Sequence, residues 1–177
     1  MAFLANLVSF QICWVAFVWG GASGRWWLGF VPLGLFAAWQ IAASRWPRSD
    51  LSTMALAFAL GVVIESTMVA AGWFTYTTAA PGLVFAPLWM LGMWINFGLT
   101  INHSMAWLKG RWLLAALFGL LGGPLTYWIA GRAWNALSVP EPIWPSLLAI
   151  GIAWAIAMPV LSAFASRLIV EPAAGRT

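Results

Sequence analysis

The segment that decides the fold class runs from Leu51 to Trp73 and reads LSTMALAFALGVVIESTMVAAGW. It is long enough to cross a bilayer as a helix, which takes roughly 20 apolar residues. Its one ionisable residue is Glu65, about two thirds of the way along. A carboxylate at membrane depth costs about 3 kcal/mol on insertion scales, so it is seldom found there without a partner or a function. The segment therefore predicts a membrane-spanning helix with a candidate site at Glu65.

The apolar character extends over the whole chain. Hydrophobic residues make up 63% of the sequence and charged residues only 7%. So few charges cannot cover the surface of a soluble domain. Continuous apolar stretches predict six helices, over residues 2–20, 26–43, 51–73, 87–108, 112–130 and 143–166. We therefore expect residues 1–177 to form one all-α integral membrane domain, a bundle of six transmembrane helices with short loops.

The lysines and arginines predict the orientation of this bundle, because cytoplasmic loops carry the excess of positive charge. Six of the eight fall on one side of the predicted membrane, namely Arg45, Arg48, Lys109, Arg111, Arg167 and Arg176. The other side has only Arg25 and Arg132. We therefore expect both termini in the cytoplasm and membrane lipids as partners of the basic loops. The pI of about 10.3 reflects this topology and does not indicate nucleic-acid binding.

The polar residues of the predicted helices fall into two layers. Counted from the cytoplasmic ends at 1.5 Å per residue, Glu65, Asn96 and Tyr127 lie about 18 to 23 Å deep, whereas His103 lies only about 8 Å deep. A direct ion pair between Glu65 and His103 is therefore not expected. Asn96, Thr100 and His103 are spaced to share one face of the fourth predicted helix. This spacing would suit a polar cleft that opens toward the cytoplasm and ends at Glu65, and the alternative is that these side chains hold the helices together by hydrogen bonds.

Three tryptophans are predicted near the middle of the membrane, away from the head-group level where Trp is usually found. They are Trp14, Trp94 and Trp154. An indole N–H at that depth needs a partner. The three rings are interpreted either as packing in the core or against lipid, or as the wall of a pocket for an apolar ligand or a transient cation.

The sequence gives no sign of a metal or a cofactor. Cys13 is its one cysteine, so neither an intrachain disulfide nor a cysteine metal site can be assembled. It contains no phosphate-binding loop, no HExxH and no GxSxG motif. We expect no bound metal and no cofactor.

Two stretches resemble a known family. They are residues 86–94, APLWMLGMW, which lead into residues 100–108, TINHSMAWL, and residues 122–127, GGPLTY. Together with Glu65-Ser66 and Gly20-Gly21, they are similar to the DUF2878 family of bacterial membrane proteins, over essentially the whole chain. The resemblance implies a multi-pass protein of a bacterial inner membrane. It supports Glu65, Asn102 and His103 as functional residues, but the family has no assigned activity.

Three functions of different classes remain open. The preferred one is a protein that binds or modifies a lipid-like or isoprenoid molecule in a pocket around Glu65. The second is a small proton-coupled transporter, and the third is an accessory subunit that contacts a second copy of the chain or another membrane protein. The candidate catalytic residues are Glu65 and His103, and the candidate ligand-binding residues are Asn96, Thr100, Asn102, Tyr127, Trp94, Trp14 and Trp154. Whether the protein is an enzyme stays open.

Overall fold

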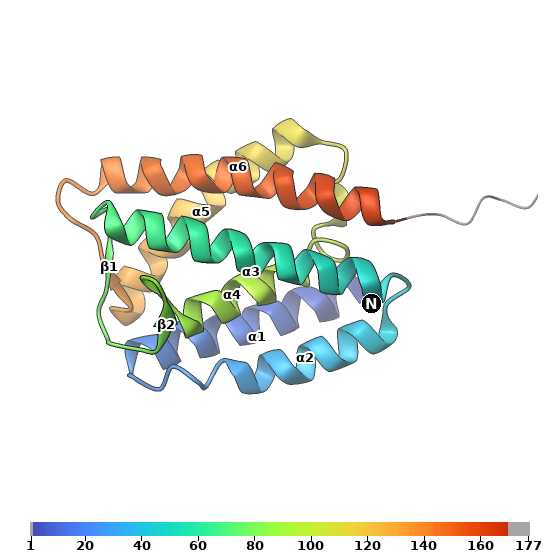
Figure 1. Ribbon diagram of the computed structural model, residues 1–177, viewed down its shortest axis with the longest axis horizontal. Helices are drawn as coiled ribbons and strands as arrows, with labels where there is room; N and C mark the ends of the chain where they lie inside the picture. Colours follow the sequence, from blue (N-terminus) through green and yellow to red (C-terminus); the bar gives the residue numbers. More distant parts are fainter. Residues whose placement is uncertain (1, 170–177) are drawn as a thin grey trace, which may run out of the picture.

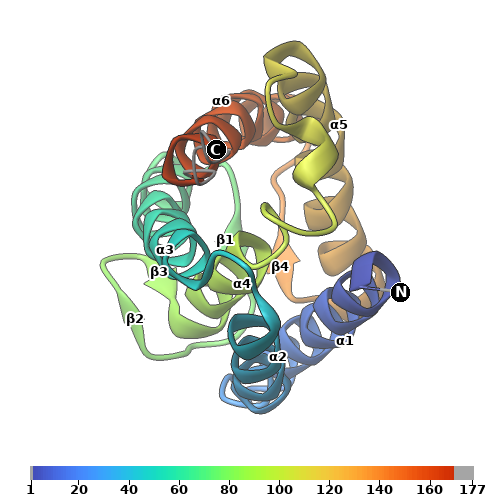
Figure 2. The ribbon, with the colours of Figure 1, turned by 90° about the vertical axis from the view of Figure 1, so that its right-hand side faces the viewer.

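The computed structural model describes residues 2–169, and within them five α-helices form a ring around a sixth (Figures 1 and 2). The ring consists of α1 (Ala2–Ala22), α2 (Phe30–Ala43), α3 (Pro47–Ala70), α5 (Trp112–Trp134) and α6 (Trp144–Leu168), and the inner helix is α4 (Leu88–Gly98). Four of them, α1, α3, α5 and α6, are long and apolar enough to cross a membrane, and α2 is a shorter apolar helix. The predicted helical membrane fold is confirmed at this level.

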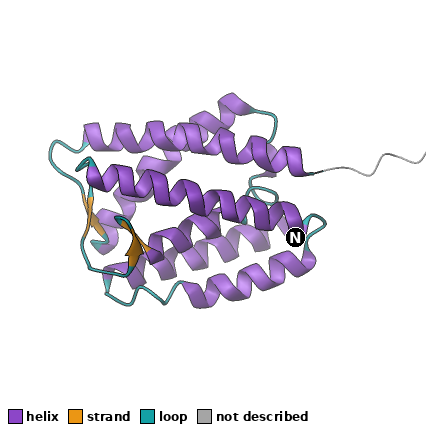
Figure 3. Cartoon of the chain, viewed as in Figure 1, coloured by secondary structure: helices purple, strands orange, loops and turns teal. Residues whose placement is uncertain are grey.

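The two ends of the bundle differ. The start of α1 and the end of α6 lie at the same end (Figure 1). The opposite end carries the short strands (Figure 3). There β1 (Thr75–Tyr76) pairs with β4 (Leu137–Ser138), and β2 (Gly82–Leu83) pairs with β3 (Ala86–Pro87), both antiparallel. The β1–β4 pair ties the loop after α3 to the loop after α5.

Several helix ends differ from the predicted ones. The structure begins α3 at Pro47 instead of Leu51, because proline fits the first turn of a helix, where its missing N–H is not needed. It begins α2 at Phe30 instead of residue 26, after a series of turns. It extends α5 to Trp134, where Asn135 adopts a left-handed conformation with φ of 54° and ends the helix.

The fourth predicted helix is the clearest correction. The helix ends at Gly98, residues 99–105 form consecutive turns, and a 3₁₀ helix, η1, covers Ala106–Leu108. Nine of the eleven residues of α4 are buried. Irregular backbone at membrane depth is tolerated where protein surrounds it and supplies hydrogen bonds, and here the Met105 N–H donates to the Thr100 carbonyl at 2.9 Å. The predicted continuous helix 87–108 is therefore wrong beyond Gly98.

Candidate functional site

Glu65 is fully buried on α3, and three side chains donate hydrogen bonds to its carboxylate. The Tyr76 hydroxyl donates to Oε2 at 2.5 Å, and the Trp94 indole N–H donates to Oε1 at 2.7 Å. The Tyr127 hydroxyl also donates to Oε1. We call these four residues the Glu65 cluster. They come from α3, β1, α4 and α5, so four separate elements meet at one carboxylate.

Local packing holds the donors in place. Gly61 on α3 leaves room for the Trp94 ring, because a Cβ at this glycine would lie 2.5 Å from Trp94 Cγ. Tyr76 is carried by β1, which pairs with β4. The Phe74 ring packs against both tyrosines, with centroids 5.5 Å from Tyr76 and 5.3 Å from Tyr127. The donors are therefore positioned by backbone pairing and by aromatic packing together.

The Glu65 cluster consists of donors around a single acceptor group. An indole N–H can only donate, and both hydroxyl groups donate to the carboxylate. Burial, and next the neighbouring Glu65 carboxylate, raises the pKa of Tyr76 well above its ordinary value. Tyr76 therefore keeps its proton and remains a donor. Hydrogen bonds of this kind offset much of the cost of burying a carboxylate.

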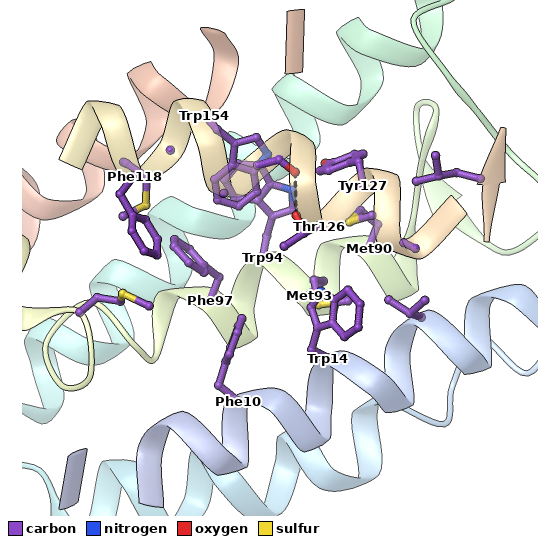
Figure 4. A pocket seen from close by; sticks show the side chains of 18 residues that line it. Phe10, Trp14, Met90, Met93, Trp94, Phe97, Phe118, Thr126, Tyr127 and Trp154 are labelled. Atoms are coloured by element: carbon purple, nitrogen blue, oxygen red, sulfur yellow. Dashed lines mark hydrogen bonds between the residues drawn. The ribbon is translucent and has the colours of Figure 1, made fainter. Parts of the chain in front are cut away.

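An apolar cavity of about 140 Å³ lies beside the Glu65 cluster, lined by residues of α1, α4, α5 and α6 (Figure 4). Its walls include the rings of Phe10, Trp14, Trp94, Phe97, Phe118 and Trp154. The Trp94 and Trp154 rings stack with their centroids 4.4 Å apart. Thr126 of α5 is exposed, and the lining residues Phe10, Trp14, Phe118 and Gly122 of α1 and α5 are half-buried.

The structure brings five of the predicted site residues to this region. Trp94 and Tyr127 each donate a hydrogen bond to Glu65. Trp94 and Tyr127 also line the cavity, together with Trp14 and Trp154. Glu65 itself does not line the cavity. Any influence of its carboxylate on a molecule there passes through Tyr127 or Trp94.

Asn96 and Thr100 do not reach Glu65 through a polar cleft, and that prediction is wrong. Both side chains are fully buried. The Asn96 Nδ2 donates to the Phe10 carbonyl at 3.1 Å, and the Thr100 hydroxyl donates to the Phe97 carbonyl at 2.7 Å. Because α4 ends at Gly98, Thr100 and the residues after it do not continue its helical face. The cavity that Trp94 and Tyr127 line is apolar instead.

His103 and Asn102 belong to a second polar cluster, built around the fully buried Asp50. Asp50 Oδ2 lies 3.1 Å from His103 Nε2, and Oδ1 accepts from Asn102 Nδ2 at 2.7 Å. Gln40 Nε2 lies 3.3 Å from His103 Nδ1, while Asn6 donates to Gln40 Oε1 at 2.9 Å. The Gln40 amide therefore donates to Nδ1, so His103 carries its hydrogen on Nε2 and donates it to Asp50.

The two clusters are far apart. Asp50 and Glu65 are fifteen positions apart on α3, which corresponds to about 22 Å at the helical rise. His103 is therefore the partner of Asp50 and not of Glu65. Lys109 donates to Asn102 at the edge of the second cluster, where burial lowers the pKa of Lys109 and the Asp50 charge opposes that effect.

Sequence reasoning missed the acidic residue at the centre of the second cluster and one of the three donors to Glu65. It placed Asp50 in a loop because the third predicted helix began one residue later. The available signal was Pro47 followed by an acidic residue in the first helical turn, a pattern typical of helix starts. Tyr76 gave no such signal, because its contact with Glu65 depends on how an irregular loop folds back on α3.

The helical bundle has four candidate membrane spans among the described residues, which makes the chain a polytopic membrane protein. Its candidate site is a buried carboxylate that accepts three hydrogen bonds, with an apolar cavity beside it. The chain belongs to the family described as "Protein of unknown function (DUF2878)", whose model matches residues 3–160. No curated protein and no solved structure matches the chain.

Proposed function

We propose that this protein binds the hydrocarbon chain of a lipid-like or isoprenoid molecule in the apolar cavity next to the Glu65 cluster. The observation that carries the proposal is the cavity itself. Its lining on α5 runs from Phe118 to Ala130, which is about 18 Å at the helical rise. One leaflet of a bilayer has a hydrocarbon depth of about 15 Å. A cavity of this length and composition suits an acyl or prenyl chain.

The size of the cavity limits what it holds. A dry cavity of about 150 Å³ accommodates a molecule the size of benzene, and this one has about 140 Å³. It therefore takes a segment of a chain, and the rest of the molecule extends from the cavity into the surrounding lipid. Entry from the membrane needs no polar path, in keeping with the apolar lining.

The proposal includes six crossings of a bacterial inner membrane with both termini in the cytoplasm. The basic residues support this orientation. Arg45 and Arg48 follow α2, Lys109 and Arg111 precede α5, and Arg167 ends α6, all at the end where α1 starts. Arg176 lies outside the described residues. In this arrangement α2, which is about 21 Å long, and α4 with η1 cross as shorter, protein-supported segments.

The alternatives have less support. A carrier needs polar access to Glu65 from both faces, whereas three donors surround this carboxylate and the cavity lined by Trp94 and Tyr127 is apolar. An accessory subunit would present the polar side chains of α4 and its continuation outward. Asn96 and Thr100 are instead fully buried within the bundle.

Native mass spectrometry with lipid extraction tests the proposal. Gly122 lines the cavity and has open space around its Cβ position, so Gly122→Leu fills the cavity without a backbone clash. Gly34→Leu on exposed α2 is the matched control, since its Cβ position is also free. We expect one class of apolar molecule on the wild type and on Gly34→Leu, and its loss from Gly122→Leu. Equal retention by all three proteins would contradict the proposal.

A further inference from the structure

A second pocket, of mixed polarity, lies at the end of the bundle that carries the strands. It has a volume of about 240 Å³ and is formed by the last turns of α5, by β4 with the loop that follows it, and by the first turn of α6. Four polar side chains line it, those of Arg132, Asn135, Ser138 and Glu141. We call this space the polar pocket, in contrast to the apolar cavity beside the Glu65 cluster.

The polar pocket contains one cation and one anion that do not pair with each other. Arg132 and Glu141 both line it and are both exposed, whereas the one ion pair among the described residues joins His103 to Asp50. A ligand with a single charge would be attracted by one of these two side chains and repelled by the other. A ligand that carries both charges finds a partner for each.

Arg132 also ends an exposed apolar face of α5. Leu121, Leu125 and Trp128 share this face with it, at spacings of three and four residues, and all three are exposed. Such a face of a membrane-spanning helix lies against lipid chains. Exposed tryptophans such as Trp128, which lines the polar pocket, and Trp144, at the start of α6, are typical of the head-group level. A lipid that covers this face of α5 therefore has its head group at the polar pocket.

We propose that the polar pocket binds the head group of a zwitterionic phospholipid, with the phosphate at Arg132 and a primary ammonium group at Glu141. A guanidinium presents parallel N–H donors that match two phosphate oxygens, and the Asn135 amide and the Ser138 hydroxyl supply uncharged donors beside it. The ammonium group donates to the carboxylate oxygens of Glu141. This inference goes beyond the proposed function, because it concerns a different pocket and does not require a chain in the apolar cavity.

The test is native mass spectrometry of the detergent-solubilised protein with lipids of identical acyl chains. Phosphatidylethanolamine carries both charges, whereas phosphatidylglycerol carries only the negative one. We expect the wild type to bind phosphatidylethanolamine about fivefold more tightly, the effect of one exposed charge pair. Soluble glycerophosphoethanolamine should bind more weakly than the lipid, because it lacks the chains that lie along Leu121 and Leu125.

Three variants connect the preference to the charges, and all three change exposed side chains. Glu141→Gln removes the partner of the ammonium group, so the preference for phosphatidylethanolamine should disappear. Arg132→Gln should weaken the binding of both lipids about fivefold. Arg25→Gln is the matched control, since Arg25 is an exposed cation at the same end that does not line the polar pocket, and it should leave both affinities unchanged.

Four results would overturn this inference. They are equal binding of the two lipids by the wild type, a preference that persists in Glu141→Gln, an equal loss of binding in Arg25→Gln and Arg132→Gln, and binding of glycerophosphoethanolamine as tight as that of the lipid. The last result would indicate a soluble zwitterion instead of a lipid. None of them bears on the apolar cavity, which Gly122→Leu tests separately.

Discussion

Replacement of Glu65 by leucine should destabilise the protein strongly, because it removes the acceptor shared by Tyr76, Trp94 and Tyr127. A buried polar group left without a partner costs about 1–3 kcal/mol, so three of them set a range of about 3–9 kcal/mol. The tyrosine hydroxyls can rotate to other acceptors, whereas the Trp94 N–H is fixed in its ring. We therefore expect a loss near the lower end of that range.

Two further variants separate the hydrogen bonds from the charge. Glu65→Gln keeps an oxygen for Trp94 and Tyr127 and turns an amide N–H₂ toward Tyr76, whose hydroxyl can accept. This variant should lose about 1–2 kcal/mol, the difference between charged and neutral hydrogen bonds. The triple variant Glu65→Leu, Tyr76→Phe, Tyr127→Phe removes two of the orphaned donors and should recover part of the loss seen in Glu65→Leu.

The assay is thermal unfolding of the detergent-solubilised protein, followed as the monodisperse fraction in size-exclusion chromatography after heating. The expected order of stability is wild type, Glu65→Gln, the triple variant and then Glu65→Leu. A Glu65→Leu protein at least as stable as the wild type would refute the reasoning. It would mean that the carboxylate is a net cost to the fold and that its three donors find other partners.

Two more predictions concern the surroundings of the same carboxylate. Gly61→Ala places a methyl group against the Trp94 ring and should lower the stability of the protein by about 1–3 kcal/mol in the same assay. The control Gly34→Ala, on exposed α2, should be neutral or stabilising. Equal effects of the two substitutions would contradict the packing argument. In Tyr127→Phe, Tyr76 is the one remaining tyrosine, and its raised pKa predicts that tyrosinate absorbance stays absent as the pH rises past about 10, the unfolded value. The contribution of the buried Tyr76 hydroxyl to stability is complete below that pH and is lost as the pH rises through the folded pKa. Titration of Tyr76 near pH 10 in the folded protein would contradict the buried hydrogen bond.

The sequence predicted the fold class well because the membrane imposes a simple rule. Apolar stretches of sufficient length become helices, and α1, α3, α5 and α6 follow from it directly. The rule fails for α4, whose surroundings are protein instead of lipid. There the backbone of residues 99–105 is free to leave the helix, and no periodicity in the sequence marks Gly98 as its end.

The candidate site was predictable in part. The position of Glu65 and the depth of Trp94 and Tyr127 follow from counting residues along helices. The contribution of Tyr76 does not, because it depends on the pairing of β1 with β4 across two loops. The link between Asp50 and His103 was missed for a related reason: these residues are 53 positions apart, and only the tertiary fold brings them together.

The most direct test of the central claim is to locate a photoreactive alkyl chain in the protein within its native membrane. Cells supplied with a diazirine-bearing fatty alcohol are illuminated, and the labelled peptides are identified by mass spectrometry. Binding in the cavity predicts adducts concentrated on its lining, such as Phe118, Gly122 and Thr126, and a loss of these adducts in Gly122→Leu. Labelling spread over exposed lipid-facing residues such as Leu35 and Val63, with no enrichment on the lining and no change in Gly122→Leu, would contradict the account.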